Sequence, residues 1–211
     1  MKAVIISGGT EPSYEVLHKE LRNCDFLVCA DSGANCIYKY KIKPNILIGD
    51  FDSASNEALE YYKKNCADII KFPPEKDFTD TELALKEVLK LEVSEIVFLG
   101  CTGTRIDHLF GNIGLLNRCL DLEINAFIKD DNNEMFIINK ESTLRGTRGT
   151  LFSIQAFGDE VKELSIIGAK YPLKDYNLKF GDPRTVSNEF LDEDVTISFK
   201  TGKVIVMKSK D

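Results

Sequence analysis

The sequence lacks the cysteine and histidine spacing of metal–thiolate sites, and it has no long apolar segments. It contains no tryptophan and only two histidines, and its six cysteines form no CxxC pair. This cysteine spacing argues against a zinc site and against a disulfide framework. The longest apolar runs are far too short to span a membrane, and no basic-then-apolar signal opens the chain. We therefore expect a soluble, cytoplasmic protein with reduced thiols.

Basic residues are outnumbered by acidic residues. The chain carries 27 lysines and arginines against 34 aspartates and glutamates, a net charge of −7. Such a protein is a poor general binder of nucleic acid. It can still bind anionic phosphates where a metal ion neutralises the site locally. At 211 residues with an ordinary apolar content of 43%, the chain is long enough for one large folded domain or two small ones.

The spacing of apolar residues changes near residue 130. Before it, apolar runs (3–6, 26–30, 45–48, 68–70, 95–99 and 123–128) alternate with helical patterns (13–23, 34–40, 55–65, 80–91 and 107–120). After it come short alternating runs at 134–138, 151–156, 161–166, 194–199 and 203–207. We predict a Rossmann-like α/β domain over 1–130, with a mostly parallel sheet and flanking helices. An antiparallel β-sandwich is expected over 131–211.

Two aspartates follow the apolar run 45–48. Gly49 lets the backbone turn as it leaves the predicted strand, and Asp50 and Asp52 come next. Two carboxylates this close repel each other unless a cation lies between them. Mg²⁺ prefers carboxylate oxygens and usually keeps positions for water and substrate phosphates. The pair therefore predicts phosphate chemistry, although the same turn also occurs in plain loops and helix caps.

Three further polar clusters follow predicted strands. Asp31 follows the run 26–30, the stretch 76–80 follows 68–70, and the stretch 102–105 follows 95–99. In an open α/β sheet, ligands bind outside the carboxyl ends of the strands. We therefore expect all four clusters to meet at one edge of the sheet.

These clusters also have structural interpretations. Thr79 is suited to cap the helix that follows it, because a glutamate lies three residues later. Asp80 at the first helical position suits the helix dipole, yet it can also give a third oxygen to a cation held by the aspartate pair. Asp31 can simply cap the next helix, and Lys76 can be a solvated loop residue.

A glycine-bearing loop precedes the predicted helix 107–120. Its backbone N–H groups, with the helix terminus behind them, are suited to phosphate oxygens; the residues concerned are Thr102, Gly103 and Thr104. Arg105 adds a permanently charged planar fork. Asp107 is the expected N-cap and is also placed to orient Arg105. His108 and Asn112 are one helical turn apart, and we expect His108 to pack or to orient a neighbour rather than to act as an acid or base.

Together these segments resemble the thiamine pyrophosphokinase family over nearly the whole chain. The matching segments are Ala30-Asp31-Ser32-Gly33-Ala34-Asn35, Ile48-Gly49-Asp50-Phe51-Asp52-Ser53, Asp77-Phe78-Thr79-Asp80, Gly103-Thr104-Arg105-Ile106-Asp107-His108 with Asn112, Gly168-Ala169-Lys170-Tyr171-Pro172-Leu173, and Ser187-Asn188. One such motif alone would be weak. Six in the same order are specific.

The resemblance implies an ATP:thiamine diphosphotransferase that gives thiamine diphosphate and AMP. It implies a homodimer whose active sites are shared between subunits, with the β-sandwich binding thiamine and forming the dimer. By motif, Mg²⁺ would be held by Asp50, Asp52 and Asp80. ATP would be bound by Asp31, Lys76, Asp77, Thr79, Thr102, Gly103, Thr104, Arg105, Asp107 and Asn112. Thiamine would be bound near Tyr171, Ser187 and Asn188. Some relatives stack a tryptophan on the substrate, and this chain has none; Tyr171 is a candidate substitute, or a packed turn residue.

Phosphoryl-type transfer needs positioning and charge neutralisation rather than a protein nucleophile. No Ser-His-Asp or Cys-His arrangement is evident in the sequence. A carboxylate such as Asp80 or Asp107 would accept the alcohol proton, and the sequence does not choose between them. The alternatives are a Mg²⁺-dependent phosphohydrolase, a pyrophosphokinase acting on a pterin alcohol, and a non-catalytic nucleotide sensor with a partner-binding β domain.

Overall fold

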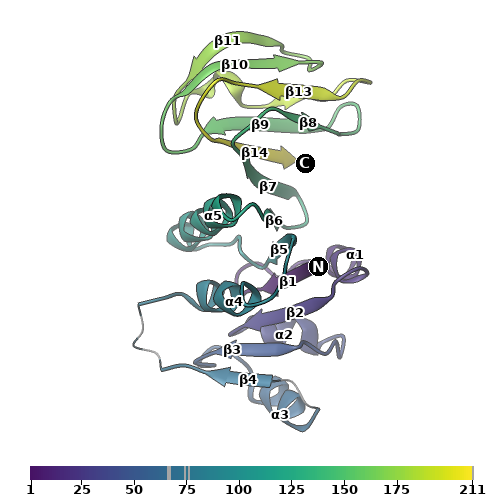
Figure 1. Ribbon diagram of the computed structural model, residues 1–211. Helices are drawn as coiled ribbons and strands as arrows, with labels where there is room; N and C mark the ends of the chain where they lie inside the picture. Colours follow the sequence, from purple (N-terminus) through teal and green to yellow (C-terminus); the bar gives the residue numbers. More distant parts are fainter. Residues whose placement is uncertain (66–67, 74, 76, 211) are drawn as a thin grey trace. The chain divides into compact units, whose positions relative to one another are not determined.

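The chain folds into two compact units, Met1–Asp131 and Asn132–Asp211. The computed structural model in Figure 1 describes residues 1–65, 68–73, 75 and 77–210. Each unit has its own apolar core. None of the described helices is both long and apolar enough to cross a lipid bilayer.

Unit 1 is built on a parallel sheet with the strand order β6-β5-β1-β2-β3-β4. Its strands are β1 (Lys2–Ile6), β2 (Phe26–Ala30), β3 (Ile46–Gly49), β4 (Asp68–Lys71), β5 (Glu95–Leu99) and β6 (Asn125–Lys129). The chain enters at β1, adds β2, β3 and β4 on one side, and then adds β5 and β6 on the other. The order therefore reverses between β1 and β5, and ligands of such sheets bind at this reversal, outside the carboxyl ends of the strands.

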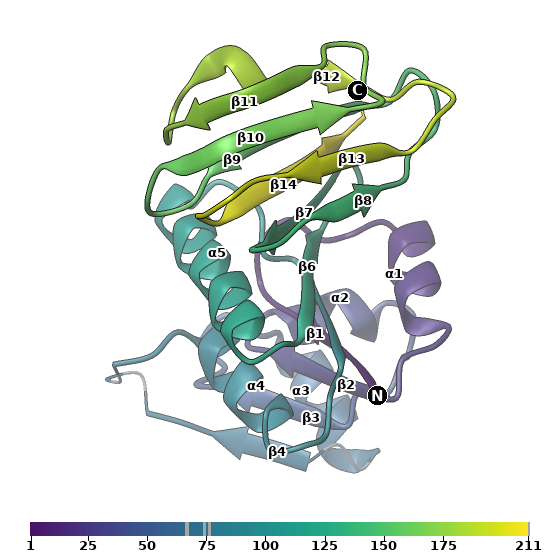
Figure 2. The same cartoon turned by 45° about the horizontal axis from the view of Figure 1, so that its top comes forward.

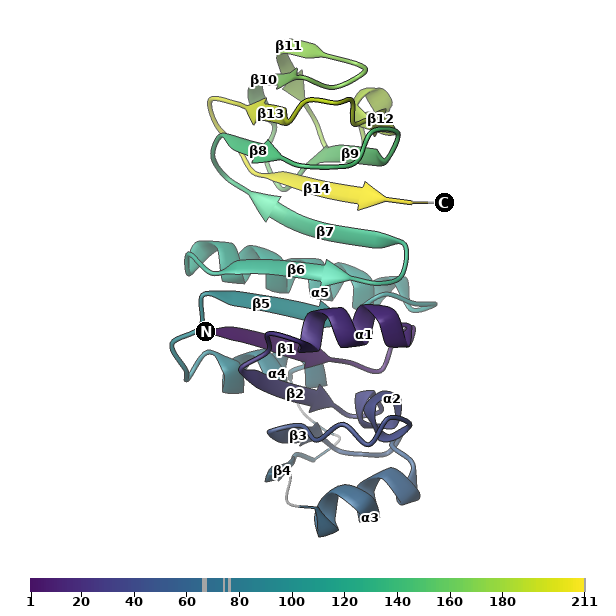
Figure 3. The ribbon, with the colours of Figure 1, turned by 90° about the vertical axis from the view of Figure 1, so that its right-hand side faces the viewer.

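Helices cover both faces of this sheet. They are α1 (Tyr14–Leu21), α2 (Gly33–Tyr38), α3 (Asn56–Lys64), α4 (Asp80–Val88) and α5 (Ile106–Asp121). Leu17 of α1, Ile37 of α2 and Tyr62 of α3 share one core cluster on one face, the face turned toward the viewer in Figure 3. On the other face α4 contacts β1, β2 and β3, and α5 contacts β6. The predicted α/β fold is confirmed.

Helix starts follow local side-chain chemistry. Ser13, Ser55 and Thr79 each accept a hydrogen bond from the backbone N–H three residues ahead, at 3.3, 3.2 and 3.2 Å, and so cap α1, α3 and α4. A cap of this kind contributes about 1 kcal/mol, because it satisfies a helix-terminal N–H that has no partner within the helix. The cap predicted at Thr79 is confirmed.

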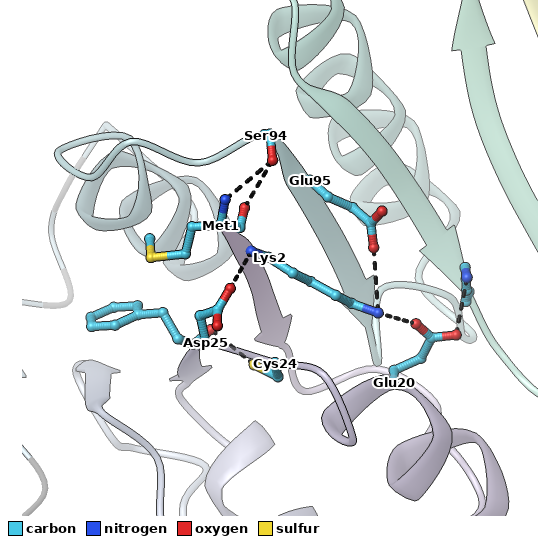
Figure 4. A network of polar contacts seen from close by, with 9 residues as sticks. Met1, Lys2, Glu20, Cys24, Asp25, Ser94 and Glu95 are labelled. Atoms are coloured by element: carbon cyan, nitrogen blue, oxygen red, sulfur yellow. Dashed lines mark hydrogen bonds and ion pairs between the residues drawn. The ribbon is translucent and has the colours of Figure 1, made fainter.

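A polar network fixes the start of β1 (Figure 4). The backbone N–H of Lys2 donates to Oδ2 of Asp25 at 2.8 Å, and its Nζ donates to Oε2 of Glu20 at 2.8 Å and lies 3.4 Å from Oε1 of Glu95. Lys129 donates to the other oxygen of Glu20 at 3.0 Å. The Glu20 side chain is only 4% exposed. Burial alone would raise its pKa, but the hydrogen bonds from the two lysines outweigh burial, and the pKa is lowered.

Unit 2 is a sandwich of antiparallel strands. One sheet has the order β12-β9-β14-β7 and the other β11-β10-β13-β8, and Figure 2 shows β11, β10 and β13 side by side. The strands are β7 (Asn133–Ile138), β8 (Ser142–Leu144), β9 (Leu151–Ala156), β10 (Val161–Ile167), β11 (Leu173–Leu178), β12 (Asn188–Glu189), β13 (Val195–Ser198) and β14 (Val204–Ser209). Both sheets supply the core, for example Phe152 and Ile154 from β9 and Leu164 and Ile166 from β10. The predicted β-sandwich is confirmed.

Three strands and one short helix of unit 2 are absent from the sequence prediction. β8 has three residues and β12 has two, too few to show an alternating pattern. β11 is mostly polar and largely exposed, and a 3-10 helix at Pro183–Thr185 follows it. β8 pairs with β13 and β12 pairs with β9, strands distant in sequence, whereas β11 pairs with β10 directly before it. Period-2 patterning does not record pairing of this kind.

Candidate active site

A cavity of about 520 Å³ opens in unit 1. Its walls come from the segments that follow β1, β2, β3 and β5 and from the first turns of α4 and α5. The lining residues are Ser7, Gly8, Gly9, Thr10, Ala30, Asp31, Ser32, Ser53, Thr79, Asp80, Thr81, Gly100, Cys101, Thr102, Gly103, Thr104, Arg105, His108 and Asn112. Residues of the predicted clusters at Asp31, Thr79–Asp80 and Thr102–Arg105 therefore meet outside the carboxyl ends of the strands, where the topology places a ligand. Asp50 and Asp52 are not among the lining residues, and their segment contributes Ser53.

The loops after β1 and β5 are joined in the wall of this cavity. The N–H of Gly9 donates to the carbonyl of Gly100, and the N–H of Thr10 donates to that of Thr102, both at 2.7 Å. A Cβ at Gly9 would lie 2.1 Å from the carbonyl oxygen of Thr102, so only glycine fits there. The Ser7–Thr10 segment is missing from the sequence prediction. It has no charged residue, but its two glycines directly after a strand were an available signal.

Three carboxylates gather on the β2–β3 side. One oxygen from each of Asp31, Asp50 and Asp52 lies within 4.8 Å of the others. Asp31 has a positive φ of 45°, and its N–H donates to the carbonyl of Ile48 at 2.8 Å. The N–H of Asp52 donates to Oδ1 of Asp50 at 3.1 Å, and the hydroxyl of Ser53 donates to Oδ1 of Asp52 at 2.7 Å. The last two bonds set the direction of the Asp50 and Asp52 carboxylates, and the backbone bond of Asp31 places its residue beside them.

Asp31 has the donor properties of a cation ligand. Its Oδ1 is buried and accepts no hydrogen bond from any described residue. Burial, together with the charges of Asp80, Asp52 and Asp50, raises the pKa of Asp31. A carboxylate oxygen that has lost its water and faces like charges is stabilised by a hard cation, so the cluster fits Mg²⁺.

Asp80 lines the same cavity but lies outside this group of three carboxylates. It is the first residue of α4, and the next residue, Thr81, shares a buried hydrogen bond of 2.8 Å between its Oγ1 and Oγ of Ser7. The structure thus brings Asp31 to Asp50 and Asp52, and the metal role of Asp80 stays a prediction. Asp77 is exposed and does not line the cavity. The predicted ATP contact of Lys76 falls outside the described residues.

Arg105 and Asp107 form a two-bond pair at the start of α5. Nε donates to Oδ1 at 3.0 Å and Nη2 donates to Oδ2 at 2.5 Å. The guanidinium holds the pKa of Asp107 well below its usual range. The prediction that Asp107 caps α5 is wrong, because the extended residue before the helix is Arg105 and the helix begins at Ile106. The Asp107 side chain is instead occupied by Arg105, the partner that the sequence also suggested.

Beneath this loop, two buried groups fix the backbone rather than react. Nδ2 of Asn112 donates to the carbonyl of Cys101 at 2.9 Å. Burial raises the pKa of the Cys101 thiol to about 12, so this cysteine stays protonated and is not a nucleophile at neutral pH. Asn112 therefore holds the backbone directly before the segment Thr102–Thr104, which lines the cavity.

The predicted thiamine residues lie together in unit 2. Asn188 is buried, and its amide both accepts from the N–H of Tyr171 at 3.0 Å and donates to the carbonyl of Tyr171 at 2.8 Å. The Tyr171 side chain is thereby fixed at its base while 58% of the residue is exposed. Ser187 is exposed at a positive φ of 58°, and its N–H donates to Oγ of Ser153 at 3.0 Å. Asn188 thus supports the two residues that reach solvent.

Both units match known protein families. Residues 17–128 match the profile described as "Thiamin pyrophosphokinase, catalytic domain", and residues 136–204 match "Thiamin pyrophosphokinase, vitamin B1 binding domain". The thiamine pyrophosphokinase of Bacillus subtilis (strain 168) is 29% identical over 214 residues, covering 100% of each chain. The Bacillus subtilis crystal structure aligns with a TM-score of 0.90 at 26% identity and 100% coverage of both chains. The crystal structure of thiamin pyrophosphokinase from Geobacillus thermodenitrificans aligns with a TM-score of 0.87 at 28% identity, covering 100% of this chain and 98% of the other.

Proposed function

Because this chain belongs to the thiamine pyrophosphokinase family, we propose that the cavity of unit 1 binds ATP and is the site of diphosphate transfer. The protein is a thiamine diphosphokinase. It transfers the β,γ-diphosphate of ATP to the hydroxyl of thiamine and forms thiamine diphosphate and AMP. The observation that supports this location is that Asp31, one of the three clustered carboxylates, lines one cavity of unit 1 together with Asp80, the glycine-bearing loop and Arg105.

Mg²⁺ would be held by Asp31, Asp50 and Asp52, and we keep Asp80 as a further candidate ligand from α4. When bound, the metal would neutralise phosphate charge and polarise phosphoryl oxygens. Without a cation the three carboxylates repel one another, so they are suited to hold one together with the phosphates of ATP.

The chain itself supplies positioning and electrostatic stabilisation. The backbone of Thr102–Thr104, next to the α5 N-terminus, lines the cavity where phosphate oxygens can accept hydrogen bonds. The Asp107 carboxylate holds the guanidinium of Arg105 in a fixed plane, from which its remaining N–H groups can donate to the moving diphosphate. We propose Asp80 rather than Asp107 as the acceptor of the thiamine hydroxyl proton, because the bond to Arg105 makes Asp107 a poor base.

We further propose that unit 2 binds thiamine and forms a homodimer, so that Tyr171 and Ser187 complete the active site of the partner subunit. Their exposure leaves both side chains accessible to a ligand, and Asn188, the residue after Ser187, fixes the backbone of Tyr171. Mixing an Asp50→Asn chain with a Ser187→Ala/Asn188→Ala chain tests this arrangement. Partial recovery of activity in the mixed dimer is expected. A fully active monomer in sedimentation analysis would contradict it.

We propose a cytoplasmic location and no nucleic-acid partner. The described cysteines, at positions 24, 29, 36, 101 and 119, are free thiols, which fits a reducing compartment. The net charge of −7 gives no general attraction to nucleic acid. The phosphohydrolase, pterin and nucleotide-sensor alternatives are not favoured, because both units match thiamine pyrophosphokinase profiles.

The metal assignment is tested by Asp52→Asn with Ser53→Ala as its matched control. Ser53 lies next to Asp52 and donates to its Oδ1 at 2.7 Å, but it contributes no carboxylate. Asp52→Asn should lower turnover at least about 1000-fold at saturating Mg²⁺, whereas Ser53→Ala should lower it about 10-fold or less. Circular dichroism should show both variants folded. Near wild-type turnover in Asp52→Asn would refute the metal role of the cluster.

A further inference from the structure

The amide of Asn35 joins helix α2 to the segment Ser53–Ser55, whose first residue lines the cavity. Asn35 lies on α2, and its Nδ2 donates to the carbonyl of Ser53 at 3.3 Å. Its Oδ1 accepts a hydrogen bond from the N–H of Ser55 at 2.8 Å. Ser53 follows Asp52 directly, and Ser55 caps α3. Both ends of the Asn35 amide are therefore used on the segment that leads away from the aspartate pair.

The position of Asn35 ties this segment to Asp31. Helix α2 begins at Gly33, two residues after Asp31, so Asn35 and Asp31 belong to one short, continuous piece of backbone. The N–H of Asp31 is also bonded to the carbonyl of Ile48, just before Asp50. The loop that carries Asp50 and Asp52 is thus bonded to the Asp31 segment on both sides, by Ile48 before it and by Asn35 after it.

The bridge acts against the repulsion within the carboxylate cluster. Three carboxylate oxygens lie within 4.8 Å of one another, and Asp52 and Ser53 are exposed, so the loop has room to move outward. We infer that Asn35 is a positioning residue that holds the Asp50–Ser53 loop against Asp31, so that the three carboxylates keep the spacing a divalent cation needs. The inference rests on the proposed metal role of this cluster.

A second asparagine in the same region provides a matched control. Oδ1 of Asn45 accepts from the N–H of Leu27 at 2.8 Å, and the N–H of Asn45 donates to the carbonyl of Leu27 at 2.8 Å. Asn45 directly precedes β3 and therefore joins β3 to β2 at the amino ends of these strands. Asn35 acts beyond their carboxyl ends, where the carboxylates lie. Loss of the Asn45 side chain removes a comparable hydrogen bond without touching the cavity.

The test measures Mn²⁺ binding to the nucleotide-free protein by electron paramagnetic resonance. Asn35→Ala should bind Mn²⁺ about 10-fold more weakly than wild type, as is typical when a residue that supports a metal ligand is removed. Asn45→Ala should bind within about 2-fold of wild type although it also lowers the melting temperature. With substrates present, the Mg²⁺ concentration for half-maximal turnover of Asn35→Ala should rise by the same factor, while kcat recovers at high Mg²⁺.

A second variant separates positioning from charge. Asn35→Asp keeps the size of the side chain and the acceptor for the Ser55 N–H, loses the donor to Ser53 and adds a negative charge. Positioning predicts weaker Mn²⁺ binding than wild type, whereas charge alone predicts tighter binding. If Asn35→Ala fails to fold, the Mn²⁺ affinity of Asn35→Asp decides whether Asn35 has a positioning role.

Three results would overturn the inference: wild-type affinity in Asn35→Ala, an equal loss in Asn45→Ala, or tighter binding in Asn35→Asp. Asp52→Asn separates this failure from failure of the proposed function. If wild type and Asp52→Asn bind Mn²⁺ equally, the metal role of the cluster is refuted, and the inference about Asn35 with it. If Asp52→Asn loses binding while Asn35→Ala keeps it, only the positioning role of Asn35 is refuted.

Discussion

Gly9→Ala should disrupt the junction between the β1 and β5 loops. A Cβ at this position would lie 2.1 Å from the carbonyl oxygen of Thr102 and 2.5 Å from that of Gly100. Both contacts are with backbone, which cannot swing aside as a flexible side chain can. The loops must therefore separate, which breaks the two 2.7 Å hydrogen bonds that Gly9 and Thr10 donate.

The expected cost follows from these contacts. Overpacking of this kind costs about 1–3 kcal/mol, and each hydrogen bond lost contributes about 1 kcal/mol. Gly9→Ala should therefore lower the free energy of unfolding by about 3–5 kcal/mol, a large part of the total stability of a typical domain. The melting temperature should fall by about 10 °C, and KM for ATP should rise because the cavity wall is displaced.

Gly114→Ala is the matched control for this prediction. A Cβ at Gly114, in the middle of α5, would meet nothing within 4 Å. The free energy of unfolding of this variant should rise by up to about 1 kcal/mol, because alanine has a better helix propensity than glycine, and its kinetics should match wild type. Thermal melting and steady-state kinetics of both variants check the pair. If Gly9→Ala melts within about 2 °C of wild type with an unchanged KM for ATP, the steric argument is wrong.

Three further outcomes are expected. Burial and neighbouring carboxylates raise the pKa of Asp31, so the charge of Asp31 destabilises the folded protein progressively as the pH rises from about 4 through this raised pKa. Metal-free Asp31→Asn should therefore have a higher melting temperature than wild type at pH 7 and an equal one at pH 3. The variant should lack turnover. An equal melting temperature at pH 7 would contradict this. Arg105→Lys keeps the charge but loses the two-bond fork, so kcat/KM should fall about 10- to 100-fold, and a fall of under 2-fold would count against a guanidinium role. Glu20→Ala removes the hydrogen bonds of 2.8 and 3.0 Å that Lys2 and Lys129 donate to one buried carboxylate, so the free energy of unfolding at pH 7 should fall by about 2–3 kcal/mol with KM for ATP unchanged; denaturant titration checks this, and a loss below about 0.5 kcal/mol would refute it.

Sequence patterns succeed here where the deciding interactions are local. The Thr79 cap depends on an N–H three residues away, and the alternation of strands and helices depends on residues within one turn or one strand. The gathering of polar clusters at one edge of the sheet was predictable because parallel strands align their carboxyl ends. Asp31, Thr79, Asp80 and the segment Thr102–Arg105 all line the same cavity.

Most of the remaining features depend on contacts that the local sequence does not encode. Asp31 joins the aspartate pair because its backbone takes a positive φ and bonds to Ile48, a residue of the neighbouring strand. The Ser7–Thr10 loop enters the site through hydrogen bonds to a loop more than 90 residues away. The start of α5 shifted because Arg105 took an extended conformation and bound the carboxylate that would otherwise have capped the helix. The first two depend on packing between distant segments, which propensity and periodicity do not record. The third is a choice between two local roles of Asp107, and the sequence offered both without deciding between them.

Product analysis tests the assignment most directly. The purified protein is incubated with Mg²⁺, ATP and thiamine, and nucleotides and thiamine phosphates are separated by chromatography. Transfer of an intact diphosphate predicts AMP and thiamine diphosphate in equal amounts, with neither formed when thiamine is omitted. ADP together with thiamine monophosphate, or phosphate released from ATP without thiamine, would contradict diphosphate transfer and identify an ordinary kinase or a hydrolase instead.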